Sequence, residues 1–312
     1  MSRVQSRTPE MGVEIAGIPL RNPVVAASGT FGYGVEFEDI LSLDRIGAFI
    51  TKGLSREPMN GNPAPRIIET ASGMINAIGL QNVGVEAFIS DKLPSIRKLK
   101  NTTCIANIFG FTVDDCIAVI ERLNDAEGVT MYELNASCPN TKHGGMVFGT
   151  DPEALAELVA RCKAVSKRPL LVKLSPNVTS IALMARIAQE AGADALSLVN
   201  TFVSLVIDVK TRRPRIANVT GGLSGPAIKP IAVRMVWEAA KAVTIPIIGM
   251  GGIATAEDAV EFLLAGATAV QVGTASYADP RAVEKIARGL TRWCETNNVA
   301  RVTELIGGLR TQ

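Results

Sequence analysis

Residues 245–273, which read IPIIGMGGIATAEDAVEFLLAGATAVQVG, contain the unit that decides the fold. An apolar run at 245–249 has the length of a strand, and a second such run at 269–273 follows a helix-patterned stretch at 256–265. Strands that are apolar along their whole length, rather than at alternate positions, are typical of parallel sheets buried on both faces. The stretch therefore predicts a strand–helix–strand unit whose two strands run parallel.

The same pattern recurs along the rest of the chain. Six further strands are predicted at 23–27, 48–52, 104–109, 131–136, 170–174 and 195–200, and four further helices at 113–123, 151–165, 181–191 and 228–242. About eight strand-then-helix units without a break in composition predict the α/β class and a single (β/α)8 TIM barrel. A doubly wound open sheet is the alternative. We expect one domain over residues 1–312, with residues 1–10 as a loosely ordered tail.

Two segments depart from the repeat. Residues 12–21, GVEIAGIPLR, predict a short β-hairpin ahead of the first barrel strand, and residues 57–82 read as a long irregular loop rich in Gly, Pro and Asn. Loops that follow barrel strands lie at the C-terminal face, where the active sites of such barrels form. We therefore expect inserted loops at that face and a functional role for residues 57–82.

Composition argues against several classes of protein. The 312 residues include 32 basic and 30 acidic residues, a net charge of +2 without a block of like charge, so a nucleic-acid partner is not expected. The first residues lack the apolar core of a secretory signal, and no apolar run approaches the length of a bilayer span. Five scattered cysteines and a single histidine, His143, argue against a disulfide scaffold, an iron–sulfur site and a multi-histidine zinc site. We expect a cytoplasmic protein without a metal site or a membrane partner.

A cysteine stands where the strand at 131–136 ends. The segment 135–140 reads NASCPN and places Cys138 between asparagines. A thiol in such a position is a candidate acid, base or nucleophile, and asparagine amides both donate and accept hydrogen bonds to a planar polar ligand. A buried structural cysteine is the alternative. The flanking asparagines favour the chemical role.

Glycines follow the last two predicted strands. Gly251 and Gly252 come directly after one, and Gly273 ends the other. Backbone N–H groups of such loops can approach a phosphate, and in barrels of this type the loops after strands seven and eight are the usual phosphate site. A third glycine-rich segment, at 220–226, could cover the same ligand.

Two lysines, Lys52 and Lys173, stand within or at the ends of predicted strands. A buried lysine is costly unless it is paired. Each could extend its charge to solvent at the barrel mouth, form a Schiff base with a substrate, or supply a fixed positive charge beside an electron-rich cofactor or an anion. Two such lysines beside a phosphate site favour the fixed charge.

Together these motifs resemble those of the dihydroorotate dehydrogenases. The matching segments are TKG at 51–53, NAIGLQN at 76–82, NASCPNTKHGG at 135–145, VKLSPN at 172–177, NT at 200–201, GGLSGPAIKP at 221–230, IGMGGI at 248–253 and VGTA at 272–275. The likeness extends from about residue 11 to the last helix, and the motifs are jointly very specific. The similarity is greatest to the FMN-containing catalytic subunit of the class 1B enzymes.

The resemblance implies a reaction and its site. Dihydroorotate would be oxidised to orotate in pyrimidine biosynthesis, with Cys138 taking the C5 proton while C6 gives hydride to N5 of one FMN per chain. Lys52 would touch both flavin and substrate, and Lys173 would lie near flavin N1 and O2. The implied substrate contacts are Lys52, Asn76, Gly79, Leu80, Asn135, Asn140, Asn200 and Thr201. The other implied FMN contacts are Ser28, Lys52, Gly53, Asn107, Asn135 and Val199, with Gly225, Gly251, Gly252, Gly273 and Thr274 on the ribityl-phosphate side.

The resemblance also implies a loop over the site and a partner. Residues 139–148 would form a loop that opens for substrate and closes over it, with His143 in a packing or access role rather than a catalytic one. Class 1B enzymes pass electrons to NAD+ through a second subunit that holds FAD and a [2Fe–2S] cluster, and two copies of each chain form a heterotetramer around a homodimer core.

Alternatives to class 1B stay open at this point. One is a class 1A homodimer that reduces fumarate, which shares most of the active-site pattern. Others are a relative of the pyrimidine-reducing domain of dihydropyrimidine dehydrogenase, a lyase or isomerase barrel with a Schiff-base lysine at Lys173, and a barrel kept as a structural subunit.

Overall fold

Eight parallel strands close into a barrel in the computed structural model, which describes residues 8–136 and 148–311. Around the barrel the strands follow the order β10, β15, β16, β3, β4, β7, β8 and β9. Their bounds are β3 Val24–Ala26, β4 Ala48–Ile50, β7 Thr103–Ile108, β8 Met131–Asn135, β9 Leu170–Lys173, β10 Ala195–Leu198, β15 Ile247–Met250 and β16 Ala269–Val272. The predicted (β/α)8 barrel and its eight strands are confirmed, and the open sheet is wrong.

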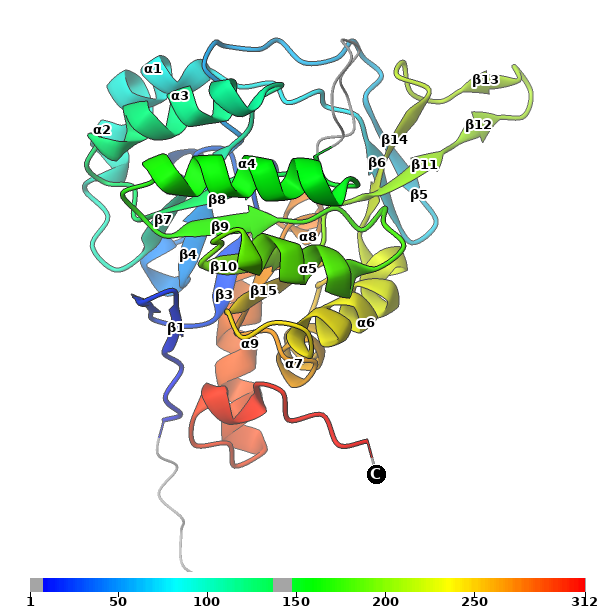
Figure 1. Cartoon of the computed structure of the whole chain (residues 1–312). Coiled ribbons are helices and arrows are strands. Elements are labelled where there is room, and N and C mark those ends of the chain that lie inside the picture. The colour runs from blue at the N-terminus through cyan, green and yellow to red at the C-terminus, as the bar shows by residue number, and fades with distance from the viewer. Residues whose placement is uncertain (1–7, 137–147, 312) are drawn as a thin grey trace, which may run out of the picture.

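Helices cover the outside of the barrel (Figure 1). Those at the predicted places are α3 Val113–Asn124, α4 Pro152–Val165, α5 Ile181–Glu190, α6 Lys229–Ala240 and α7 Ala256–Leu264. After the last strand come the short α8 Ala275–Ala278 and the long α9 Ala282–Thr296, which packs against β3 and α7. None of the helices in the described part of the chain combines the length and apolarity that a bilayer crossing requires.

Local sequence explains where several helices begin. Thr112 accepts a hydrogen bond from the backbone N–H of Asp115, whose side chain accepts one from the backbone N–H of Thr112, and Thr255 and Asp258 form the same capping box before α7. Such reciprocal bonds satisfy two backbone donors that the first helical turn leaves unpaired. These caps fix the helix starts, and with them the lengths of the loops that lead from the barrel strands.

The first strand-to-helix unit differs from the prediction. Between β3 and β4 the chain forms only two 3-10 helices, η1 Val35–Phe37 and η2 Leu43–Arg45. Gly29, Gly32 and Gly34 adopt positive φ angles of 84°, 53° and 89° in this connection. An α-helix needs negative φ at every residue, so no α-helix can form over residues 29–34. The next connection holds α1 Gly84–Ala87, the π-helix η3 Phe88–Lys92 and α2 Leu93–Ile96.

A four-stranded antiparallel sheet, here called the cover sheet, lies outside the barrel (Figure 1). Its order is β11 Phe202–Leu205, β14 Thr220–Ser224, β6 Gly73–Asn76 and β5 Ile67–Thr70. The prediction of one irregular loop over 57–82 is therefore wrong, because β5 and β6 lie within it. In the register Asn76 pairs with Gly222, and Ser224 pairs with Met74, 150 positions away.

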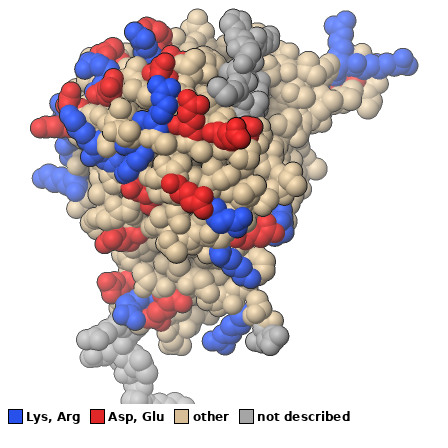
Figure 2. Space-filling view, viewed as in Figure 1, with Lys and Arg blue, Asp and Glu red and all other residues tan. Residues whose placement is uncertain are grey.

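Smaller elements complete the chain. The predicted N-terminal hairpin is confirmed as β1 Val13–Ile15 and β2 Ile18–Leu20. Strands β12 Ile207–Asp208 and β13 Arg213–Pro214 form an arm that projects from the cover sheet, and basic side chains gather at its tip (Figures 1 and 2). The 3-10 helix η4 Pro226–Ile228 leads into α6, and η5 Val302–Leu305 follows α9.

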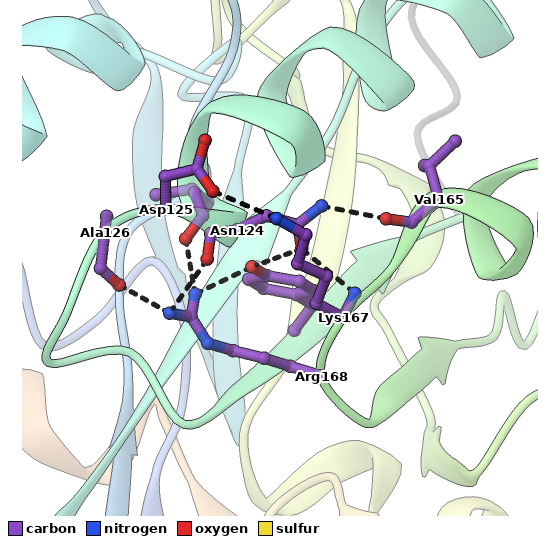
Figure 3. Close-up of polar contacts among 8 residues, drawn as sticks. Asn124, Asp125, Ala126, Val165, Lys167 and Arg168 are labelled. Carbon is purple, nitrogen blue, oxygen red and sulfur yellow. Dashed lines mark hydrogen bonds and ion pairs between the residues drawn. The ribbon is translucent and has the colours of Figure 1, made fainter.

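Arg168 ties together the chain segments ahead of β9 (Figure 3). Its guanidinium donates to the backbone carbonyls of Leu123 and Ala126 and to the hydroxyl of Tyr132, the last at 2.7 Å. Arginine's planar set of donors suits carbonyls at and just after the C-terminal end of a helix, here α3. The Leu123 carbonyl also accepts from the backbone N–H of Ala126 at 3.0 Å. The contact lies at the starts of the barrel strands, away from their C-terminal ends.

Candidate active site

A cavity of about 450 Å³ lies at the C-terminal ends of the barrel strands. Its walls come from the ends of those strands, from the loops that follow them, and from β6 and β14 of the cover sheet. In a barrel of parallel strands the C-terminal ends converge on one face, so side chains far apart in the sequence meet there. The cover sheet adds a wall that a plain barrel does not have.

The predicted site residues come together around this cavity. The ones that line it are Ser28, Lys52, Gly53, Asn76, Gly79, Leu80, Asn107, Asn135, Lys173, Val199, Asn200, Thr201, Gly251, Gly252, Gly273 and Thr274. Cys138, Asn140 and His143 lie outside the described residues. Gly225 is described but does not line the cavity.

Packing accounts for the glycine at position 225. Gly225 has φ 92° and is buried where β14 meets β6, and a Cβ there would stand 2.8 Å from the Cα of Gly73. Its carbonyl oxygen in turn lies 2.7 Å from where a Cβ on Gly252 would stand. Contacts this short exclude any side chain, so the close approach of the cover sheet explains this glycine without a ligand.

Packing within the protein does not require a glycine at position 273. A Cβ built on it would meet only ordinary contacts, the nearest being 3.4 Å from the Cβ of Ala27. The protein itself therefore has room for a side chain at this position. Gly273 lines the cavity, and the missing side chain keeps that wall open where Gly251 and Gly252 also line it. Such a wall of exposed backbone lets a ligand approach main-chain N–H groups closely.

A buried polar cluster lies at the base of the cavity. Glu133 is fully buried on β8 and accepts a hydrogen bond of 2.6 Å from the side-chain amide of Asn107. Ser197 and Gln271 each donate to its other oxygen at 2.8 Å. Lys173 Nζ lies 3.9 Å from Glu133 Oε1. The carboxylate therefore receives donors from several strands of the barrel.

Sequence reasoning missed Glu133, Ser197 and Gln271. The signal was present, because each is a polar residue inside an otherwise apolar strand, in MYELN, ALSL and AVQV. The same argument that singled out Lys173, that a buried polar group needs a partner, applies to all three. Only the closed barrel reveals that they are partners of one another.

Gln271 has an unsatisfied atom. Its Oε1 is buried and has no hydrogen-bond partner among the described residues, although the residue lines the cavity. Buried carbonyl oxygens usually have a donor, and leaving one unpaired costs about 1–3 kcal/mol. The cavity therefore offers an acceptor to a bound group that carries an N–H.

Amides also line the side of the cavity. Asn200 donates to Oδ1 of Asn135 at 3.3 Å, and Oδ1 of Asn200 accepts from the backbone N–H of Thr201 at 2.8 Å. Asn76 reaches the cavity from the cover sheet. Because each amide has both donors and acceptors, this wall suits a ring whose edge alternates C=O and N–H.

Lys52 follows β4 and is half-buried at the cavity. Burial, together with the charge of Arg66, holds the pKa of Lys52 below its ordinary value. Arg66 is itself fixed by a 2.6 Å hydrogen bond to the side-chain oxygen of Gln81, which also lines the cavity. Two neighbouring cations favour an anion at this end of the cavity, since an anion would relieve their repulsion.

Comparisons with known proteins all match the chain to the same family. Residues 10–293 match the family model described as dihydroorotate dehydrogenase. The chain is 57% identical over 301 residues to the protein of Pelobacter propionicus named dihydroorotate dehydrogenase B (NAD(+)), catalytic subunit, covering 96% of this chain and 99% of that one. It is 58% identical over 303 residues to the protein of the same name from Geotalea uraniireducens, with 97% and 99% covered. A Solibacter usitatus protein, provisionally named dihydroorotate dehydrogenase A (fumarate), is 57% identical over 303 residues, with the same shares covered.

Proposed function

The chain belongs to the dihydroorotate dehydrogenase family, and from this premise we propose that it oxidises dihydroorotate to orotate in pyrimidine biosynthesis. The observation that carries the proposal is the lining of the cavity. Two cations, Lys52 and Lys173, share it with side-chain amides on several walls and with a wall of bare glycine backbone. These are the groups that an anionic pyrimidine and a phosphate-bearing cofactor need.

We propose that the amides bind the substrate. Asn76, Asn135 and Asn200 would bind the C=O and N–H edges of the ring, and Thr201 and the backbone of Gly79 and Leu80 would join them. Lys52 would bind the substrate carboxylate, because burial beside Arg66 favours an anion there. Asn140 would complete this set, although it lies outside the described residues.

Cys138 is the proposed base. It lies outside the described residues, three positions after Asn135 in the sequence, and Asn135 lines the cavity at the end of β8. A thiol has an ordinary pKa of about 8.5, so a modest lowering makes it a competent base near neutral pH. Cys138 would take the proton from C5 of dihydroorotate.

Members of this family depend on a flavin, and we propose that the cofactor here is FMN, one per chain. When bound, FMN supplies the acceptor for the hydride from C6 of the substrate. The residues fit the group: Gln271 Oε1 lacks a donor, and the flavin ring carries one N–H between two carbonyls. Lys173 would favour the negative charge that gathers at N1 and O2 on reduction.

The other proposed FMN contacts fall into two groups along the cavity. Ser28, Gly53, Asn107 and Val199 would contact the ring, together with Lys52 and Asn135. Gly251, Gly252, Gly273 and Thr274 would bind the ribityl phosphate, which the open wall at Gly273 supports. Gly225 would act indirectly, by holding the cover sheet close to Gly252.

We propose further that the chain works with an electron-transfer subunit. The relatives from Pelobacter propionicus and Geotalea uraniireducens are named catalytic subunits, which implies a second subunit. This chain shows no NAD-binding fingerprint and no cysteine cluster in its sequence. The partner would hold FAD and a [2Fe–2S] cluster and reduce NAD+, in a heterotetramer around a homodimer of this chain.

Fumarate is the second candidate acceptor. The provisional name of the Solibacter usitatus relative supports fumarate as the acceptor. This relative is 57% identical to the chain, as is the catalytic subunit from Pelobacter propionicus. Assays of the purified chain alone with fumarate, and of the chain with its partner and NAD+, separate the two. Turnover with fumarate by the chain alone would favour the homodimeric enzyme. Membership of the family argues against the Schiff-base lyase.

The visible spectrum of the purified chain, recorded anaerobically before and after adding dihydroorotate, tests the proposal. We expect a flavin spectrum that dihydroorotate bleaches. A flavin that stays oxidised after dihydroorotate is added would contradict the proposed substrate. A colourless protein that FMN cannot reconstitute would contradict the proposed cofactor. Mass spectrometry of the released flavin separates FMN from FAD.

A further inference from the structure

Glu133 is a carboxylate sealed inside the barrel. It is 0% exposed, and every polar neighbour it has among the described residues is a donor. Asn107 donates to Oε1, Ser197 and Gln271 donate to Oε2, and Lys173 Nζ stands 3.9 Å from Oε1. This set suits an ionised carboxylate, which can only accept. Burying such a charge is expensive, and an apolar side chain would fill a barrel interior at lower cost.

The neighbours of Glu133 connect it to the cavity. Asn107, Lys173 and Gln271 line the cavity, whereas Glu133 and Ser197 do not. They stand on β7, β9 and β16, which reach Glu133 on β8 from different sides of the barrel. Through its two oxygens, one carboxylate therefore fixes which way two amides point and sets how much of the Lys173 charge acts on the cavity.

We propose that Glu133 is a positioning residue of the cofactor site, and that it sets both the affinity for FMN and the reduction potential of the bound flavin. This inference rests on the proposed function, since it takes FMN as the group in the cavity. Glu133 holds the amides of Asn107 and Gln271, so that the unpaired Gln271 oxygen is presented rather than turned away. Its negative charge offsets part of the Lys173 charge and so limits how far the site favours reduced flavin.

Two substitutions separate these effects. Glu133→Gln keeps the length of the side chain but removes the charge, so Lys173 acts on the flavin without compensation. Because it also turns one accepting oxygen into a donating NH2 that faces donors, the reduction potential and not the FMN affinity is its readout. We expect the midpoint potential of the bound flavin to become more positive. The ratio of the affinities for reduced and oxidised FMN should rise at least tenfold, which corresponds to about 30 mV for a two-electron couple. Glu133→Asp keeps the charge but shortens the reach. We expect Glu133→Asp to bind FMN about tenfold more weakly. Its reduction potential should lie closer to the wild-type value than that of Glu133→Gln does.

Ser197→Ala is the matched control. It removes the hydrogen bond that Ser197 donates to the same carboxylate and the one that it accepts from the Gln271 amide at 3.0 Å. It changes neither the charge nor a residue that lines the cavity, and the Gln271 amide keeps its 2.8 Å hydrogen bond to Glu133. We expect the FMN dissociation constant and the potential to stay at their wild-type values within error. Thermal unfolding of each apo variant, with circular dichroism of the barrel, shows whether a change in FMN binding follows from loss of the fold.

The outcomes are distinct. A folded Glu133→Gln protein with the wild-type potential overturns the charge effect, and a Glu133→Asp protein with wild-type FMN affinity overturns the positioning effect. If Ser197→Ala moves the potential as far as Glu133→Gln, general damage to the cluster explains the change and the proposal is wrong. If both Glu133 variants fail to fold, Glu133 serves the stability of the barrel and the proposal is likewise wrong. Failure of the proposed function would appear separately, as a wild-type chain that does not bind FMN or is not reduced by dihydroorotate.

Discussion

The side-chain amide of Asn200 donates a 3.3 Å hydrogen bond to Oδ1 of Asn135, and this bond links the ends of β10 and β8 beside β9, which lies between them in the barrel. The backbone N–H of Thr201 fixes the orientation of the Asn200 amide. Both asparagines line the cavity. They therefore present a coordinated pair of amides rather than two independent contacts.

This arrangement predicts different results for the two asparagines. Asn200→Ala should raise KM for dihydroorotate about tenfold or more, since each lost hydrogen bond to a bound ligand costs about 1–3 kcal/mol, while FMN content stays unchanged. Asn135→Ala should weaken both substrate and FMN binding, because Asn135 is proposed to contact both. Steady-state kinetics and FMN titration measure the two effects. An Asn200→Ala enzyme with an unchanged KM would contradict the proposed substrate site.

Cys138 and Cys104 provide a contrast between a chemical and a structural thiol. Cys138→Ala should retain FMN but lose about 10²–10⁴-fold in the rate of flavin reduction, the usual contribution of a general base. Cys138→Ser should shift the pH optimum upward, because a hydroxyl is harder to deprotonate than a thiol. Burial strongly raises the pKa of the Cys104 thiol, which therefore stays protonated.

Cys104→Ala is the control for this experiment. Cys104 is buried on β7 and lies outside the cavity lining, so its loss should leave the rate of flavin reduction unchanged. Stopped-flow reduction by dihydroorotate under anaerobic conditions gives the rates. Normal reduction by Cys138→Ala would exclude Cys138 as the base.

The barrel could be predicted from the sequence because its strands carry a local signal. A strand buried on both faces is apolar throughout, as in β3 and β15, and a single stretch of sequence shows this. The cover sheet has no such signal. Its strands β6 and β14 pair across 150 positions at Ser224 and Met74, and β14 is rich in glycine, which a local reading assigns to a loop. The extent of the domain, residues 1–312, stays a prediction.

Site residues could be predicted where a charged residue stands in or at the end of an otherwise apolar strand. Lys173 stood out as a charge at the end of an apolar strand, and the structure places it at the cavity. Glu133 and Gln271 lie on β8 and β16, which are not neighbours in the barrel, and only closure of the barrel brings them within 2.8 Å. The roles of Cys138 and Asn140 stay predictions, because both lie outside the described residues.

The ion pair of Lys173 and Glu133 predicts a coupled effect on stability. Lys173→Met should destabilise the apoprotein by about 3–5 kcal/mol, because it leaves the buried Glu133 charge without its cation. The double variant Lys173→Met with Glu133→Gln removes both charges and should be more stable than Lys173→Met alone. Denaturant unfolding of the apoproteins measures this. Equal stability of Lys173→Met and the double variant would show that the unpaired Glu133 charge is not what destabilises Lys173→Met.

Lys52 predicts the pH dependence of substrate binding. Its pKa is lowered, first by burial and then by the charge of Arg66, and only its protonated form can bind the substrate carboxylate. KM for dihydroorotate should therefore be constant at low pH and rise as the pH passes upward through this lowered pKa. The rise should begin at a lower pH than for an ordinary lysine.

Two variants test the assignment of this rise in KM to Lys52. Lys52→Met should have a high KM without this pH dependence. Arg66→Gln removes one of the two causes of the lowered Lys52 pKa, and the rise in KM should therefore occur at higher pH. A KM that keeps the wild-type pH profile in Lys52→Met would assign the dependence to another group.

Arg168 predicts a loss of stability without a loss of chemistry. Arg168→Met should destabilise the protein by about 2–3 kcal/mol, because the carbonyls of Leu123 and Ala126 and the hydroxyl of Tyr132 lose a charged donor (Figure 3). Lys167→Met is the control, since Lys167 and Asp125 form an ion pair at the surface and its loss should change stability by less than about 0.5 kcal/mol. Because both residues lie at the starts of the barrel strands, kcat and FMN affinity at a temperature where each variant is folded should match the wild type. Denaturant unfolding gives the stabilities, and an Arg168→Met protein as stable as Lys167→Met would show that the carbonyls find water or other donors instead.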